Sequence, residues 1–225
     1  MANQFDLQEQ EQLDELKHFW NAWGGLISWA LVLVLAALAA WNGYQFWQTR
    51  QAGQAAALAE VVEQAAQTKD VARVQQAFDD LKSGHAGTVQ AGQAGLAAAK
   101  ALADAGKQDA AKAVLGWVAE KAGDEGYRAL GKLRLAAVLI DEKAYDKALA
   151  QLAGGFPPEF DALVADRKGD ALTLAGKKSE AIAEYRRAYQ ALEESAPYRR
   201  LVEAKLNALG ARVDAAPAAR AGSAA

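Results

Sequence analysis

The feature that most constrains this chain is an uncharged, apolar run near its N-terminus. No charged side chain occurs from Phe19 to Thr49, and the centre of the run, Leu26–Ala40, is almost wholly apolar. About 20 residues at ~1.5 Å each cross the ~30 Å hydrocarbon layer of a membrane. A helix that is apolar on every side has no water-facing stripe, so lipid suits it better than water. The run therefore predicts a transmembrane helix over residues 19–48, preceded by an acidic leader over residues 1–18.

Aromatic and small side chains add detail to this span. Amphipathic rings gather at the two headgroup layers of a membrane, and five of the six tryptophans lie in this one segment. The predicted interfacial anchors are Trp20, Trp23, Trp41, Tyr44 and Trp47. Small residues at helical spacing let a second membrane helix approach closely, although alanine is also a common filler of such segments. The candidate helix contacts are Ala36, Ala39, Ala40 and Gly43.

Two questions about the span stay open at the level of sequence. Ala37-Leu38-Ala39 satisfies the small-x-small rule of signal-peptide cleavage, which would release a soluble secreted protein. An acidic leader favours an uncleaved anchor, because a signal peptide begins with a basic region. Orientation depends on which end carries more Lys and Arg, and here Lys17 balances Arg50.

The rest of the chain predicts an all-α solenoid. After Arg50 the sequence is rich in Ala, Leu, Lys, Glu and Gln, and apolar residues recur at helical rather than strand spacing. Turns are expected at Gly106, Glu142–Lys143 and Gly176, inside three helical pairs. The predicted helices span about 52–67, 70–82, 88–104, 108–121, 125–141, 145–153, 160–174, 178–193 and 197–208.

Superposing the three turns reveals a repeat. The columns of small residues step by 37 and then 33 residues, close to the ~34-residue tetratricopeptide period. Small residues are expected where the two helices of a hairpin cross, since larger ones would push the axes beyond about 8–10 Å. The two columns are Ala99, Ala136 and Gly169, then Ala111, Ala148 and Ala181. Leu102, Leu139 and Leu172 form a third, and Leu115, Leu152 and Tyr185 a fourth.

This repeat organises the chain after the membrane span. Residues 49–87 form a first helical pair that fits the columns poorly and is expected to be an atypical cap. Residues 88–209 form the tetratricopeptide-like solenoid, closed by helix 197–208. Residues 210–225 are rich in Ala and Gly, and a tract that buries so little is expected to be disordered. The expected fold is one transmembrane helix followed by about four helical hairpins and a capping helix.

The chain offers little catalytic or metal-binding chemistry. It has no cysteine and only two histidines, His18 and His85, which excludes thiolate zinc sites, iron–sulfur ligation and thiol nucleophiles. The net charge of −3 provides no basic field for a nucleic acid. No nucleophile, base and orienting group can be assembled, so we expect no catalytic, metal or cofactor site and no enzyme activity.

Three stretches resemble a known family. These are Leu133–Ala136, Ala162–Ala171 and Lys205–Leu209, which are similar to Leu-Arg-Leu-Ala, Val-Ala-Asp-x-x-Gly-(Asp/Glu)-Ala and Asn-Ala-Leu patterns of the YfgM family. Its leader also enters the membrane through a similar Lys-(Arg/His)-Phe-aromatic sequence. The resemblance covers about residues 11 to 209, and YfgM proteins are bacterial inner-membrane proteins described as ancillary subunits of the SecYEG translocon.

The resemblance implies a cytoplasmic N-terminus and a periplasmic C-terminal domain in the bacterial inner membrane. It also implies partnership with SecYEG, with PpiD, a membrane-anchored periplasmic chaperone, and with translocating or unfolded polypeptides. It carries over no catalytic residues. The alternative with the same fold is a solenoid that faces the cytoplasm and organises another membrane complex there.

A solenoid of this kind binds its partners on a defined face. In this architecture the first helix of each pair usually lines the concave side, and side chains exposed there are candidate partner contacts. The repeat register predicts that this groove exposes Lys100, Leu133, Ala137, Asp166, Asp170 and Thr173.

Overall fold

The computed structural model describes residues 3–212, with side chains from Lys17 onward, and within that range it is helical without strands. The chain divides into two compact units after Gln51, which are considered separately below. The helices are α1 (Asn3–Gln67), α2 (Val71–His85), α3 (Val89–Asp104), α4 (Gln108–Lys121), α5 (Glu125–Asp141), α6 (Tyr145–Gln151), the 3-10 turn η1 (Pro158–Phe160), α7 (Asp161–Leu174), α8 (Lys178–Ala191) and α9 (Pro197–Ala208).

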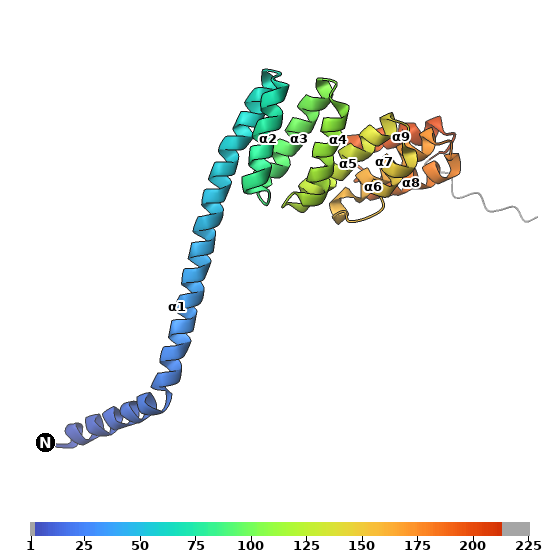
Figure 1. The fold of residues 1–225 in the computed structure, drawn as a ribbon. Coiled ribbons are helices and arrows are strands. Elements are labelled where there is room, and N and C mark those ends of the chain that lie inside the picture. The colour runs from blue at the N-terminus through green and yellow to red at the C-terminus, as the bar shows by residue number, and fades with distance from the viewer. Residues whose placement is uncertain (1–2, 213–225) are drawn as a thin grey trace, which may run out of the picture. The chain divides into compact units, whose positions relative to one another are not determined.

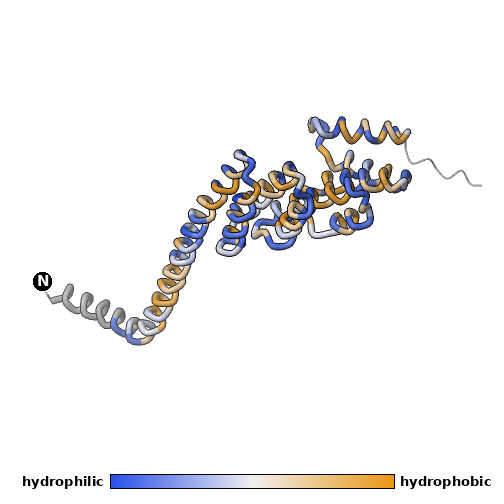
Figure 2. Tube along the Cα trace, turned by 45° about the horizontal axis from the view of Figure 1, so that its top comes forward, coloured by the Kyte–Doolittle hydropathy of each residue, from blue (hydrophilic) through white to orange (hydrophobic). Residues whose placement is uncertain are grey.

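The apolar run lies inside α1, and it is coloured as strongly hydrophobic in Figure 2. By length and composition the part of α1 from Lys17 onward can cross a membrane, and only 6% of its most apolar window is buried within the protein. A core helix of a soluble domain would be mostly buried instead. The sequence predicts a separate helix from residue 52, whereas α1 is continuous from Asn3 to Gln67. Only Gly53 interrupts the junction, and a single glycine costs a helix about 1 kcal/mol relative to alanine.

From Ala52 onward, helices that follow one another along the chain pack side by side (Figure 1). The last four turns of α1 pair with α2, and the further hairpins are α3–α4, α5–α6 and α7–α8. The predicted helix ends are close to the observed ones. The largest difference is α2, which continues to His85 instead of ending at residue 82.

All four hairpins turn through the same backbone motif. The second residue after each first helix has a positive φ: 57° at Lys69, 74° at Gly106, 62° at Lys143 and 77° at Gly176. In the second hairpin the Gly106 N–H donates to the Ala103 carbonyl at 2.9 Å and the Lys107 N–H to the Leu102 carbonyl at 2.8 Å. This pair of bonds is the Schellman motif, which satisfies carbonyls at the end of a helix. The motif places every hairpin in one common register.

Small side chains fill the positions where the helices cross. All six members of the two small-residue columns are buried: Ala99, Ala111, Ala136, Ala148, Gly169 and Ala181. Gly169 shows why size matters, because a Cβ there would lie 2.5 Å from the Tyr185 ring. No side chain larger than hydrogen fits at that crossing without moving the tyrosine.

The first hairpin follows the same turn register as the others, although its residues fit the size columns poorly. Counted from Lys69, the small-residue positions hold Val62 and Val74, and the two larger positions hold Ala65 and Phe78. All four side chains are buried in one apolar cluster. The hairpin therefore carries larger residues in both small columns and a smaller one, Ala65, in one of the large columns, and such compensating changes are tolerated in a packed core. An alignment by residue size alone misses that compensation.

Helix α9 closes the other end of the solenoid. It ends in the same motif as the first helices, with φ 74° at Gly210 and the Ala211 N–H donating to the Leu206 carbonyl at 2.9 Å. Val202 and Leu206 are buried against α8. The register places α9 where the first helix of a fifth hairpin would lie. This is the position expected for the predicted capping helix 197–208. The predicted disordered tail lies mostly outside the described residues, which end at residue 212.

Candidate functional site

The six predicted groove residues divide into three groups. Lys100 is exposed, and Ala137, Asp170 and Thr173 are partly buried. Leu133 and Asp166 are buried, with 8% and 1% exposure. The prediction that these last two are exposed is therefore wrong.

The repeat register explains the error. Leu96, Leu133 and Asp166 occupy the same position relative to their turns, and all three are buried. This column packs between successive hairpins, so its side chains do not reach the groove. A leucine suits such a position, whereas a carboxylate there needs hydrogen-bond donors and a counter-charge. Asp166 aligns with two leucines in the repeat. This alignment is the sequence signal that could have identified it as a buried residue.

Asp166 finds those partners on α9. The Tyr198 hydroxyl donates to Asp166 Oδ2 at 2.6 Å, and Lys205 Nζ donates to both carboxylate oxygens at 2.8 Å. The side chain of Asp166 is 2% exposed and that of Lys205 is 24% exposed. The carboxylate is thus neutralised by charge-assisted hydrogen bonds, which are stronger than those between neutral groups. Sequence reasoning missed Tyr198 and Lys205, because they are far from Asp166 in the chain.

Asp170, one helical turn further along α7, extends this network. It accepts hydrogen bonds from Lys205 Nζ at 2.7 Å and from the Tyr185 hydroxyl at 2.8 Å. Arg167 lies 3.5 Å from its other carboxylate oxygen. The Thr173 hydroxyl donates to the Gly169 carbonyl at 2.8 Å. The network joins α7, α8 and α9, and it uses the two aspartates that we predicted as groove contacts.

The tyrosines of this network are held in their neutral form. Burial raises the pKa of Tyr198 above its ordinary value, and the hydrogen bond to Asp166 raises it further. Burial is also the main cause that raises the pKa of Tyr185, with a smaller contribution from Asp170. A neutral phenol can donate to a carboxylate, whereas a phenolate would repel it. Both aspartates therefore accept hydrogen bonds from a neutral phenol and from Lys205, which favours a structural role over acid–base chemistry.

An open groove lies on the first helices at the other end of the solenoid. It is a cavity of about 340 Å³ between α1 and α3, and Lys100 is the one predicted groove residue that lines it. Three of its seven lining residues are alanines, and Glu63 and Asp104 add negative charge. Lys100 forms an exposed ion pair with Asp104. The lining is Glu63, Ala66, Gln67, Ala97, Lys100, Ala101 and Asp104.

The predicted membrane residues all lie on the surface of α1. The anchors Trp20, Trp23, Trp41, Tyr44 and Trp47 are 55–62% exposed. The small residues Ala36, Ala39, Ala40 and Gly43 are exposed as well. A Cβ at Gly43 would meet nothing within 4 Å. This surface has room for lipid or for a second helix.

Comparison with known proteins agrees with this architecture. A family model described as a tetratricopeptide repeat-like domain matches residues 17–211. A protein of Neisseria gonorrhoeae named "Ancillary SecYEG translocon subunit" is 33% identical over 207 residues, which are 90% of this chain and 98% of the relative. A protein of Haemophilus influenzae with the same name is 29% identical over 195 residues, 83% of this chain and 91% of that relative. Since the family model covers most of the chain and the Neisseria relative aligns along nearly its whole length, the chain belongs to the YfgM family.

Proposed function

We propose that this chain is a non-enzymatic scaffold that is tethered to the bacterial inner membrane and associates with the SecYEG translocon. The observation that carries the proposal is the end-to-end alignment with a relative named as a translocon subunit, in which the apolar helix and the solenoid occur together. We further propose that the N-terminus is cytoplasmic and the solenoid periplasmic. There the solenoid assists emerging polypeptides together with a PpiD-type chaperone.

Tethering supplies the physical mechanism. An anchor confines the solenoid to the membrane surface, which raises its effective concentration near a membrane-bound partner without any new contact. The exposed small residues of α1, Ala36, Ala39, Ala40 and Gly43, are proposed as the contact with a translocon helix. The aromatic anchors would fix the depth of α1 in the bilayer.

The groove between α1 and α3 supports the proposal that the solenoid binds emerging polypeptides. Between α1 and α3 this groove is lined by three alanines together with Glu63, Lys100 and Asp104. Shallow apolar surface with charges of both signs suits an extended polypeptide of varied sequence better than one fixed ligand. Within residues 17–212 no cluster of three or more His, Asp or Glu could hold a metal ion. The tetratricopeptide-like fold and the relatives' names also favour a scaffold over a catalyst.

Protease accessibility of a C-terminal tag tests the membrane topology. We expect protease added to spheroplasts to remove the solenoid and leave a protected fragment that contains the leader and the apolar helix. Intact mass would also distinguish the uncleaved anchor from a chain cut after Ala39. If the tag is cleaved only in inverted vesicles, the solenoid is cytoplasmic and the proposed periplasmic role is wrong.

Site-specific photocrosslinking tests the groove. A photoreactive residue in place of Lys100 should crosslink to a polypeptide arrested during translocation. Lys121, an exposed lysine at the end of α4, provides the control because it lies outside the groove lining. Equal crosslinking from both positions would contradict the groove, while crosslinking to SecYEG from the small residues of α1 would still support the association.

A further inference from the structure

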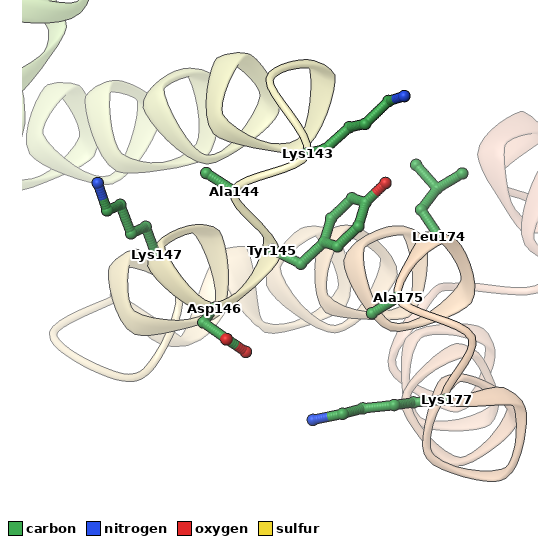
Figure 3. Close-up of a pocket in the computed structure, with 8 residues that line it drawn as sticks. All are labelled: Lys143, Ala144, Tyr145, Asp146, Lys147, Leu174, Ala175 and Lys177. Carbon is green, nitrogen blue, oxygen red and sulfur yellow. The ribbon is translucent and has the colours of Figure 1, made fainter.

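A second concave surface lies at the edge of the solenoid where the hairpins turn. It is a pocket of about 500 Å³ between the α5–α6 turn and the α7–α8 turn. Figure 3 shows the Tyr145 ring extending between these turns toward Leu174, while the side chains of Lys143, Lys147 and Lys177 extend outward from the rim of the pocket in three directions. A volume of this size is in the range of pockets that bind ligands.

The three lysines of this pocket are not paired with a carboxylate in the part of the chain whose side chains are described. None of their ammonium groups makes a hydrogen bond or an ion pair within residues 17–212, in contrast to Lys82, Lys100 and Lys112, which all pair with carboxylates. Asp146 is the one carboxylate in the lining, so the pocket carries excess positive charge. A concave surface lined by one sign of charge focuses the field and attracts the opposite charge.

Apolar surface accompanies this charge. Leu174 is 58% exposed, more than any other leucine among the described residues of the solenoid. Tyr145 is partly buried beside it. The combination suits a ligand that is acidic and also presents an apolar side chain. A membrane surface would contact residues that protrude from the protein, whereas Tyr145 is partly buried. The pocket therefore suits a peptide that inserts a side chain better than it suits a membrane surface.

The repeat register provides an internal comparison. Lys69, Arg73 and Lys107 occupy, two hairpins earlier, the positions of Lys143, Lys147 and Lys177. The basic residues are thus the same in number at both places, but their neighbours differ. Where the pocket has Ala144 and Leu174, the earlier turns have Asp70 and Asp104.

Those two aspartates reduce the excess positive charge of the earlier turns. Asp70 caps α2 by accepting the Arg73 backbone N–H, and Asp104 pairs with Lys100. Because Asp146 of the pocket stands where the earlier hairpin has Ala72, the pocket has one carboxylate fewer than its counterpart, and it gains an exposed leucine.

We propose that this pocket binds an acidic, extended segment of a partner protein, which inserts an apolar side chain between Tyr145 and Leu174. Lys143, Lys147 and Lys177 pair with the carboxylates of that segment. This pocket is separate from the groove between α1 and α3. Its binding of an acidic segment does not depend on the association with SecYEG, and it therefore goes beyond the proposed function.

The test uses the full-length chain in nanodiscs of zwitterionic lipid and a fluorescent peptide, Glu-Glu-Leu-Glu-Glu. Binding is measured by anisotropy at low ionic strength, with Gln-Gln-Leu-Gln-Gln as the neutral control peptide. We expect the acidic peptide to bind and the neutral one not to bind. Charge reversal of the pocket (Lys143→Glu, Lys147→Glu and Lys177→Glu together) should weaken binding at least ~10-fold, since each exposed pair contributes up to about 1 kcal/mol.

The matched control is Lys69→Glu, Arg73→Glu and Lys107→Glu together, which changes the net charge equally at equivalent backbone positions. It should alter binding by less than about 2-fold, because long-range charge is screened by salt. Leu174→Ser should weaken binding of the peptide severalfold and should not affect a peptide with serine at its centre. Circular dichroism compares the folding of the variants, and the single changes Lys177→Glu and Lys107→Glu replace the triple ones if either fails to fold.

Several results would overturn the proposal. One is absence of acidic-peptide binding, and another is equal weakening by the two triple variants, which would indicate a response to net charge alone. A third is binding to phosphatidylglycerol vesicles, lost in the pocket variant, without any binding of the peptide. That result would assign the lysines to a membrane surface instead of a protein partner.

Discussion

The first and the last hairpins of the solenoid share one register but are stabilised by different chemistry. In the first, Val62, Val74 and Phe78 are buried in a cluster built only from apolar side chains. The Trp117 ring packs edge-on against Phe78, with ring centroids 5.3 Å apart. Apolar burial is non-directional and roughly proportional to area, so this end tolerates exchange of large and small residues between columns.

The fourth hairpin and α9 depend instead on a polar network. Asp166 replaces a leucine of the buried column and binds Tyr198 and Lys205 of α9. Hydrogen bonds to a buried carboxylate require defined distances and directions, so they fix how α9 lies on α7. The comparison shows that one repeat register can be maintained by apolar packing at one end of the solenoid and by directional hydrogen bonds at the other. The two ends should therefore respond differently to substitution.

Lys205→Met should have the largest effect, a loss of about 3 kcal/mol in the local stability of α9. It leaves the buried Asp166 carboxylate without its cation, which is strongly destabilising for a buried pair. Hydrogen exchange of the α9 amides measures this local stability.

Lys100→Met is the control for the Lys205 substitution, because it also breaks a Lys–Asp pair. In that pair the side chains are 72% and 64% exposed, and the expected cost is below about 1 kcal/mol. Equal effects of the two substitutions would mean that the network adds no more than a surface ion pair.

Val74→Ala examines the apolar end and should cost about 2 kcal/mol of stability in the first hairpin. The change makes the sequence match the small-residue column better, yet it removes buried methyl groups and leaves a cavity beside Phe78. Denaturant unfolding of the full chain in detergent measures the loss, and hydrogen exchange assigns it to α1 and α2. A gain in stability would show that the first hairpin is an imperfect copy of the other repeats and not a compensated one.

The sequence predicts the helical architecture well because it depends on local signals. Gly106 and Gly176 supply positive φ at two turns, and the apolar run of α1 exceeds what a small core can bury. The network around Asp166 was not predicted, since its partners Tyr198 and Lys205 come from α9, more than 30 residues away. Asp166 and Asp170 lie on the same helix, and helical periodicity alone does not distinguish them. The element that packs against α7 decides which of the two is buried.

Gly169→Ala should cost about 1–2 kcal/mol at the crossing of α7 and α8. The new Cβ would lie 2.5 Å from the Tyr185 ring, and overpacking of this kind costs about 1–3 kcal/mol, partly offset by the better helix propensity of alanine. The readout is the same denaturant experiment, together with hydrogen exchange of α8.

Gly116→Ala is the matched substitution for Gly169→Ala, in the interior of α4. Nothing lies within 4 Å of its added Cβ, so it should stabilise the chain by about 0.5–1 kcal/mol. If both substitutions stabilise, then the small-residue columns do not limit how closely the helices approach.

Alkaline pH should weaken the polar end selectively. Burial and the neighbouring aspartates raise the pKa of Tyr185 and Tyr198 above the ordinary tyrosine value of about 10. The stability from their neutral hydroxyls is therefore complete below pH ~10, and it is lost as the pH rises from there toward the raised native values. The wild-type chain should lose about 1 kcal/mol more than Tyr185→Phe/Tyr198→Phe between pH 9 and 11, measured by denaturant unfolding and hydrogen exchange of α9. The exchange of α2 should be the same in both chains at each pH, because no described contact of the first hairpin involves either tyrosine. A constant difference between the two chains across this range would show that the hydroxyls do not hold α9 in place.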